Sequence, residues 1–218
     1  MPAERARRLR TADREHGTTL VELLVVMGLL STVLSIVMAA LVSIQNTENR
    51  VNARGQTNDQ VRLAVDEIDR QVRSGNVLYD PAGEGTNAGA SIPAGFSMRV
   101  YTQANGTFKC VQWRVTGGQL QSRSWTTTWQ IDGQVSGWRT VAEDIVNTTS
   151  NPPFALDAGA GYTGHLIDLD IIGNVRSDTG SNVEATASVA GRNQQYGYST
   201  TTCGGVGGNL AGNTIPNP

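Results

Sequence analysis

Histidine and cysteine are scarce: the 218 residues hold two of each, His16 and His165, and Cys110 and Cys203. Neither cysteine has a histidine near it in the sequence, so a cysteine nucleophile with a histidine base is not expected. These scattered residues also lack the spacing of zinc ligands. The glycine-rich run 204–208 lacks the Lys-Ser/Thr that completes a phosphate-binding loop. We therefore predict no enzymatic activity, no cofactor and no metal site.

An excess of positive charge is also absent. The chain has 17 Lys and Arg against 19 Asp and Glu, a formal net charge of −2 at pH 7. Residues 1–17 carry five arginines and three acidic residues, so the remainder of the chain has a net charge of −4. Such a chain is not attracted to phosphate backbones, and general nucleic-acid binding is not expected.

Charged residues are missing from residues 23–44, and no proline occurs in residues 18–80. In a helix that rises about 1.5 Å per residue, these 22 uncharged residues cross a hydrocarbon layer of roughly 30 Å. The arginines before the segment favour a cytoplasmic N-terminus, which places the C-terminal part outside the cytoplasm. A secretory signal is not indicated, because the apolar stretch is too long and no small-residue cleavage site follows it.

Glu22 stands at the beginning of this apolar segment. On position alone, it marks the membrane interface, where a carboxylate costs less than at the bilayer centre. A cut after Gly17 changes that interpretation, because the new ammonium on Thr18 would lie four residues before Glu22, about one helical turn away. Opposite charges at that spacing attract strongly in a medium of low dielectric, within one chain or between neighbours. Glu22 is then a docking charge, and the helix dipole also favours it in the first turn.

Residues 17–25, GTTLVELLV, resemble the cleavage and methylation motif of type IV prepilins and of the pseudopilins of type II secretion. The resemblance implies that prepilin peptidase, a membrane-embedded aspartic peptidase, cuts after Gly17 and methylates the new N-terminus at Thr18. It also implies that Glu22 pairs with the N-terminus of a neighbouring subunit during filament assembly. The family usually has phenylalanine directly after the cut, where this chain has Thr18.

An amphipathic pattern follows the apolar segment. Four apolar residues recur at spacings of four, three and four, as on the buried face of a helix: Val61, Val65, Ile68 and Val72. Gly75 is a C-terminal stop signal. We therefore predict that the helix continues through residues 45–75, with Gly28 and Gly55 as the positions where it bends or melts most easily.

A strand-rich region is predicted after the helix. Residues 76–93, which contain Asp80-Pro81 and several glycines, are interpreted as a loop. Alternating apolar residues between 96 and 125 predict three antiparallel strands in a meander, with a turn at Gly117-Gly118. The same alternation in residues 165–175 and 183–190 predicts a second hairpin. The glycine- and asparagine-rich tail that follows cannot form much core.

The two cysteines lie in the part that we place outside the cytoplasm. There, Cys110 and Cys203 either form a disulfide or remain free thiols, and an oxidising compartment favours the bridge. Closing a loop of about 93 residues would contribute roughly 4 to 5 kcal/mol in the chain-entropy description.

Two further groups of residues have both a functional and a structural interpretation. Asp168 and Asp170 share one face of a predicted strand and either offer oxygen ligands to calcium, which some pseudopilins bind, or form a solvated face. The tryptophans either line a sugar or partner surface or, as we expect, pack in the core and on the sheet: Trp113, Trp125, Trp129 and Trp138.

Together these features predict an α+β fold with a long N-terminal hydrophobic helix, as in pilins, packed on an antiparallel β-sheet domain with a loop-rich C-terminal region. The predicted parts are a leader peptide, a transmembrane or filament-core helix, its amphipathic continuation, an antiparallel β domain and a Gly/Asn-rich tail: residues 1–17, 18–44, 45–75, 76–190 and 191–218.

The resemblance implies a minor pilin or pseudopilin of a type IV pilus or type II secretion filament. Its partners would be prepilin peptidase, other pilin or pseudopilin subunits, the assembly platform and the cytoplasmic membrane. The protein would cross that membrane once before it enters a cell-surface or envelope filament. The alternative is a single-pass membrane-anchored extracellular binding module, or an enzyme, in which residues 20–44 are an uncleaved anchor and Gly17 and Glu22 are incidental.

Overall fold

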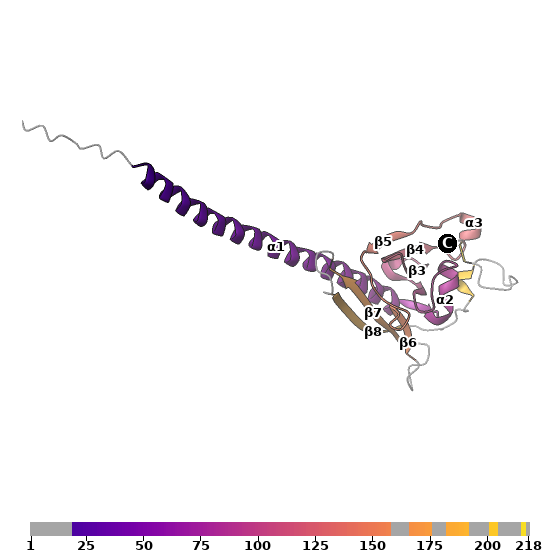
Figure 1. Ribbon diagram of the computed structural model, residues 1–218. Helices are drawn as coiled ribbons and strands as arrows, with labels where there is room; N and C mark the ends of the chain where they lie inside the picture. The colour runs from indigo at the N-terminus through magenta and orange to yellow at the C-terminus, as the bar shows by residue number, and fades with distance from the viewer. Residues whose placement is uncertain (1–18, 158–165, 176–181, 192–200, 205–214, 217–218) are drawn as a thin grey trace, which may run out of the picture. The chain divides into compact units, whose positions relative to one another are not determined.

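A computed structural model describes residues 19–157, 166–175, 182–191, 201–204 and 215–216. Within these ranges a long helix is followed by two antiparallel sheets, as Figure 1 shows. The predicted α+β fold with a long, apolar N-terminal helix is therefore confirmed. The chain divides into two compact units, Met1–Thr47 and Glu48–Pro218.

Helix α1 (Leu20–Arg73) has 54 residues and contributes to both units. Gly28 and Gly55 both lie inside it, so neither glycine ends the helix. In the second unit the predicted apolar face is buried at Val61, Ile68 and Val72, each of which is fully buried. Ala64 is also fully buried, whereas the neighbouring Val65 is half-buried.

The first sheet has five strands in the order β1-β2-β3-β4-β5, each antiparallel to its neighbours. The predicted three-stranded meander forms its middle. Gly117 and Gly118 join β3 to β4 with φ of 56° and 73°, values that residues with a Cβ rarely adopt. The bounds are β1 (Gly75–Leu78), β2 (Ser97–Thr102), β3 (Lys109–Thr116), β4 (Gln119–Trp125) and β5 (Arg139–Ala142). Short helices η1 (Ala104–Gly106) and α3 (Trp129–Asp132) lie in its connections.

The interpretation of residues 76–93 as a loop is wrong in part, because they contain most of β1 and helix α2 (Pro81–Ala88). Asp80 caps α2: its side chain accepts a hydrogen bond from the backbone N–H of Ala82 at 2.9 Å. Pro81 follows in the first turn, where its missing N–H costs nothing. Gly85 allows close packing, since a Cβ there would lie 2.6 Å from the carbonyl oxygen of Ile92.

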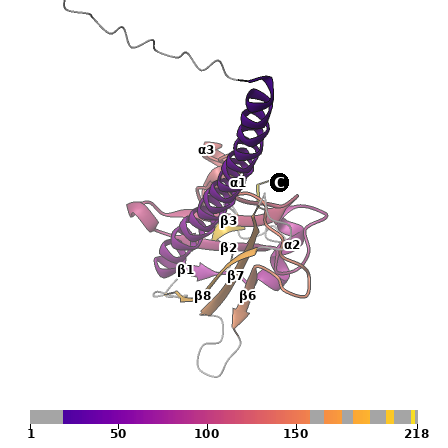
Figure 2. The same cartoon turned by 60° about the vertical axis from the view of Figure 1, so that its left-hand side comes forward.

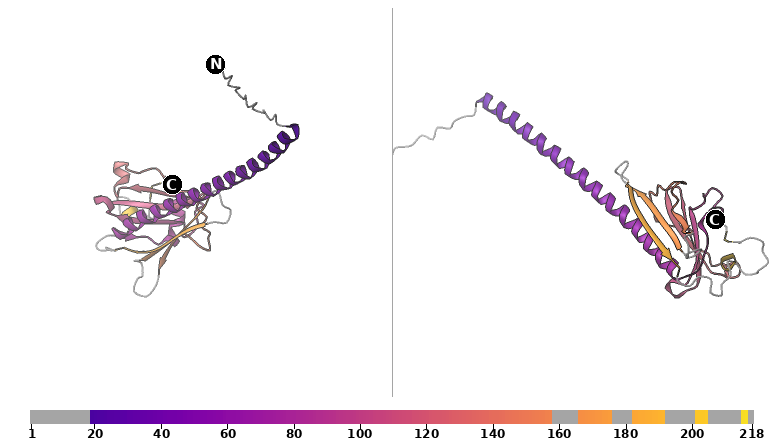
Figure 3. Two further views of the ribbon diagram at one scale, coloured as in Figure 1. Left: turned by 90° about the vertical axis from the view of Figure 1, so that its left-hand side faces the viewer. Right: turned by 90° about the horizontal axis from the view of Figure 1, so that it is seen from below.

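The second sheet has three strands in the order β6-β7-β8: β6 (Phe154–Asp157), β7 (Leu166–Asn174) and β8 (Asn182–Ala190). The predicted second hairpin is β7-β8, and β6 is a strand that we did not predict. The second half of α1 packs against this sheet, because a Cβ on Gly173 would meet Thr57 and Val61. Figures 2 and 3 show β7 and β8 beside this part of the helix.

One hydrophobic core joins the second half of α1 to both sheets. It includes Ile68 of the helix, Met98 and Trp113 of the first sheet, and Ile167 and Ile171 of the second. The indole N–H of Trp113 donates to the side-chain oxygen of Gln71 at 2.8 Å, which pairs the buried polar group of each element. The buried residues of α1, which lie between Thr57 and Val72, therefore connect the helix to the core of the domain.

Candidate functional site

Thr19 caps the start of α1. Its hydroxyl oxygen accepts a hydrogen bond from the backbone N–H of Glu22 at 3.3 Å, and its carbonyl oxygen accepts one from Leu23 at 3.1 Å. Thr19 and Glu22 therefore have the Thr-x-x-Glu spacing of a capping box, a signal in the sequence that our prediction did not use.

The side chain of Glu22 is exposed and lies in the first turn of α1. There, backbone N–H groups without helical partners and the helix dipole both favour a negative charge. Gly17 and Thr18, the predicted cleavage and methylation positions, lie outside the described residues, as does the histidine at 16. The described part of the chain thus places a carboxylate at the entrance of the apolar helix.

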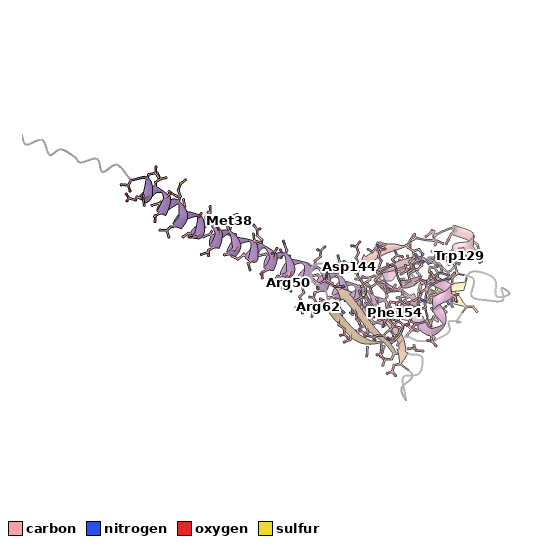
Figure 4. All side chains as sticks on the ribbon, in the orientation of Figure 1. Met38, Arg50, Arg62, Trp129, Asp144 and Phe154 are labelled. Atoms are coloured by element: carbon pink, nitrogen blue, oxygen red, sulfur yellow. A yellow bond between two sulfur atoms is a disulfide. The ribbon has the colours of Figure 1, made fainter. Side chains whose placement is uncertain are left out.

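The first part of α1 exposes apolar side chains on all sides. From Leu20 to Ile44, 17 large apolar residues are exposed, and Met38, labelled in Figure 4, is 54% exposed. A helix that is apolar around its whole circumference needs a membrane or other helices around it. The helix is long and apolar enough to cross a membrane, near the N-terminus of the chain.

Three hydroxyl groups in this apolar part are satisfied within the helix. Ser31 donates to the carbonyl oxygen of Gly28 at 2.9 Å, Thr32 to that of Leu29 at 2.8 Å, and Ser35 to that of Ser31 at 2.7 Å. Such bonds replace those to water, which hydrocarbon does not provide. These polar residues are therefore compatible with a lipid or helix-packed environment.

The predicted disulfide is confirmed: Cys110 of β3 is bonded to Cys203 of the short helix η2 (Thr202–Gly204), and both residues are fully buried. Cys203 is also held by two aromatic side chains. Its backbone N–H donates to the hydroxyl of Tyr79 at 3.3 Å, and its carbonyl accepts from the indole N–H of Trp125 at 3.2 Å. The tail is thus fastened to the first sheet at this point.

A row of buried polar side chains crosses the first sheet, and our prediction did not include it. Arg99, Gln112 and Arg123 are paired in register on adjacent strands and are at most 4% exposed. Gln112 accepts from Nε and Nη2 of Arg123 at 2.9 and 2.8 Å. Arg99 donates through Nη2 to Glu84 of α2 at 2.8 Å.

Alternation along the strands places these three polar side chains on one face of the sheet, a face that is often in contact with solvent in antiparallel sheets. It is buried instead, because α2 brings Glu84 over Arg99, and Pro216 accepts a hydrogen bond from Arg123 at 2.9 Å. The guanidinium of Arg99 also lies 3.8 Å from the ring centroid of Tyr79. The polar row therefore fixes the positions of α2 and the tail on the sheet.

Burial shifts the pKa values of Arg123 in this row and of Glu84, which lies over it. Burial raises the pKa of Glu84, although the positive charge of Arg99 opposes the shift. Burial, together with repulsion from Arg114 and Arg99, lowers the pKa of Arg123 to about 10. Glu84 therefore faces Arg99 in a region where ionisation is costly.

The Glu84→Gln variant is expected to become more stable, relative to the wild type, as the pH rises. Because the pKa of Glu84 is raised in the folded state, its contribution to stability is largest at low pH and falls as the pH rises through its ordinary value. The variant lacks this loss. Its free energy of unfolding relative to the wild type should increase between about pH 4 and pH 7 in denaturant titrations of the full chain in detergent.

Glu48→Gln, at an exposed position of α1, is the control and should show no such trend. A relative stability of Glu84→Gln that falls with pH would mean that attraction to Arg99 outweighs the burial of the carboxylate.

The tryptophans serve core and sheet packing, as expected. Trp113 and Trp125 are buried, at 0% and 2% exposure, and Trp138 is half-buried with the guanidinium of Arg114 3.8 Å from its ring centroid. Trp129 is half-buried on α3. The four tryptophans therefore do not form a single exposed surface.

Asp168 and Asp170 lie on the same face of β7, as the alternation predicts. Asp168 accepts a hydrogen bond from the hydroxyl of Ser188 on β8 at 2.5 Å. Among the residues that the structure describes, no group of three His, Cys, Asp or Glu side chains is arranged to hold a metal ion. His165 lies outside the described ranges.

No protein-family model matches the chain, and no curated protein matches it. The geometry of α1 and its capped, acidic first turn therefore carry the functional argument.

Proposed function

We propose that the protein is a minor pilin or pseudopilin, a structural subunit of a type IV pilus or of a type II secretion-like filament. It is inserted in the cytoplasmic membrane, cleaved after Gly17 by prepilin peptidase, and assembled through its N-terminal helix. The domain that follows lies outside the cytoplasm. This function is associative and mechanical, and it involves no catalysis by the chain itself.

The observation that carries the proposal is the composition of α1. Its first half exposes apolar side chains in every direction, whereas in its second half Val61, Ala64, Ile68 and Val72 belong to the core of the domain. An all-round apolar helix packs equally well in lipid and among copies of similar helices, so transfer between the two environments costs little. This is the physical requirement for a subunit that leaves a membrane to join a filament.

Glu22 favours the transfer from the membrane to the filament. A carboxylate within an apolar assembly is costly unless a positive charge meets it. After a cut between Gly17 and Thr18, the N-terminal ammonium of a neighbouring subunit is the expected partner. The size of the chain and its loop-rich second half favour a minor subunit over a major one.

A second candidate is a membrane-anchored binding module. A groove of about 360 Å³ at one end of the first sheet favours it, since Phe108, Trp125 and Val135 contribute apolar surface there. Phe108 and Val135 are 46% and 36% exposed. In this case α1 is a permanent anchor, and residues 1–17 remain attached.

Co-expression with a prepilin peptidase tests the first proposal. The wild-type chain is expected to lose the mass of residues 1–17, whereas Gly17→Val, which puts a branched side chain at the cleavage position, is expected to keep it. Both chains should remain in the membrane fraction, because the substitution lies outside α1. An uncleaved wild type, or a variant cleaved as efficiently as the wild type, would favour the anchored module.

A further inference from the structure

Among the residues that the structure describes, none forms a strand along the outer side of β8. It is the last strand of the second sheet, and its nine residues pair with β7 in unbroken register from Leu166↔Ala190 to Asn174↔Asn182. Within the described ranges, no strand pairs with its other side. Alternate backbone N–H and C=O groups on that side are therefore available to another strand.

The other three sheet edges are protected in ways that β8 is not. Strands β1, β5 and β6 have four residues each. The register of β1 shifts between Gly75 and Val77, that of β5 shifts at its pairing with β4, and β5 carries Arg139. Strand β8 has no proline, lysine, arginine or register shift, and its only charge is Glu184. Long, regular, nearly uncharged edges are the ones that natural proteins pair with another strand.

The sequence of β8, NVEATASVA, is nearly symmetric about Thr186. In an antiparallel pair of two β8 strands centred on Thr186, valine 183 faces valine 189 and alanine 185 faces alanine 187. Glu184 faces Ser188, so no like charges stand opposite each other. The two Thr186 side chains meet at the centre, a favourable cross-strand pair.

Space is present beside the strand. A groove of about 620 Å³ lies between β8 and the second half of α1, lined by Arg62 and Asp66 of the helix and by residues of β8 from Glu184 to Thr186. Figure 4 labels Arg62 on this stretch of the helix. The β8 side chains on the core side, Val183 and Ala185, are only half-buried, so an added strand would cover more of them.

We propose that β8 is the interface between two copies of this chain. The strands pair antiparallel across a twofold axis at Thr186, which joins two three-stranded sheets into one of six strands. The contact is isologous, so each copy contributes the same residues. This proposal concerns the domain and does not depend on the proposed pilin function.

Cysteine substitutions test both the partner and the register. In the full chain in membranes, Thr186→Cys is expected to form a disulfide-linked dimer on mild oxidation, because directly opposed residues have Cα atoms about 4.5 to 5.5 Å apart. Glu184→Cys and Ser188→Cys should each fail to link to themselves, since four residues of strand separate the two copies by about 14 Å. Mixed together, these two variants should link. The native cysteines are bonded to each other and do not compete.

Equal linking of Thr186→Cys and Glu184→Cys alone would indicate random collision and overturn the proposal. A link from Thr186→Cys to a different protein would mean that β8 pairs with another partner and not with a second copy.

A second test uses no added cysteine. Thr186→Lys should shift the full chain in detergent from dimer to monomer, because two lysines meet at the axis, and association should weaken by about tenfold or more. Thr140→Lys, at an exposed position of β5, should remain dimeric. Dimers of Thr186→Lys, or a monomeric wild type, would also overturn the proposal.

Discussion

Replacing Glu22 by leucine is expected to reduce incorporation into a filament severely while membrane insertion and removal of residues 1–17 continue. The carboxylate is the expected partner of a neighbour's N-terminal ammonium, and their attraction in a medium of low dielectric amounts to several kcal/mol. Each 1.4 kcal/mol changes an equilibrium tenfold, so incorporation should fall by at least about one order of magnitude. Leucine also makes insertion slightly easier, because it removes a charge from the apolar segment.

The measurement is the amount of the chain in sheared filaments relative to the membrane fraction. Glu48→Leu is the matched control, since Glu48 is also an exposed glutamate of α1 but lies beyond the apolar part. It should be incorporated as the wild type is. If Glu22→Leu enters filaments normally, the carboxylate has no docking role and marks only the membrane interface or the helix cap.

Replacing both Cys110 and Cys203 by alanine is expected to lower the free energy of unfolding by about 2 to 5 kcal/mol. The bond joins two cysteines that are 93 positions apart in the sequence. Its loss also weakens the position of Cys203, whose backbone bonds to Tyr79 and Trp125 lie in the same small core. The double substitution avoids leaving one reactive thiol in that core.

Denaturant unfolding of the full chain in detergent measures this effect. Reducing agent should destabilise the wild type and leave the double variant unchanged, which separates loss of the bond from the loss of side-chain volume. A double variant as stable as the oxidised wild type would mean that the hydrogen bonds around η2 hold the tail without the bond.

Local patterns were sufficient to predict α1 and the middle of the first sheet. The four-three-four spacing on α1 identified the face buried at Val61, Ile68 and Val72, because a helix repeats every 3.6 residues wherever it packs. Alternation likewise identified β7 and β8. Helix α2 was missed although Asp80-Pro81 is a good start signal, because its glycine content indicated a loop.

The buried polar row was harder to predict for a physical reason. Alternation assigns residues to the two faces of a strand, but it does not say what covers each face. Arg99, Gln112 and Arg123 are buried because α2 and the tail, which are distant in sequence, lie over them. Only the three-dimensional arrangement could show this, and only it could show that no described strand pairs with the outer side of β8.

The candidate site was also predicted from the sequence only in part. The apolar segment and Glu22 were evident from composition, and the Thr-x-x-Glu spacing at Thr19 was present in the sequence but not used. The cleavage position at Gly17 and Thr18 remains a prediction, since it lies outside the described residues.

The most direct test of the proposed function is the identity and mass of the N-terminal residue of the protein isolated from its native membrane. We expect a chain that begins at Thr18, with residues 1–17 removed, with or without a methyl group on the new N-terminus. A chain that still carries residues 1–17 would contradict the proposed function, and would identify α1 as a permanent anchor for a module whose function lies in its sheets.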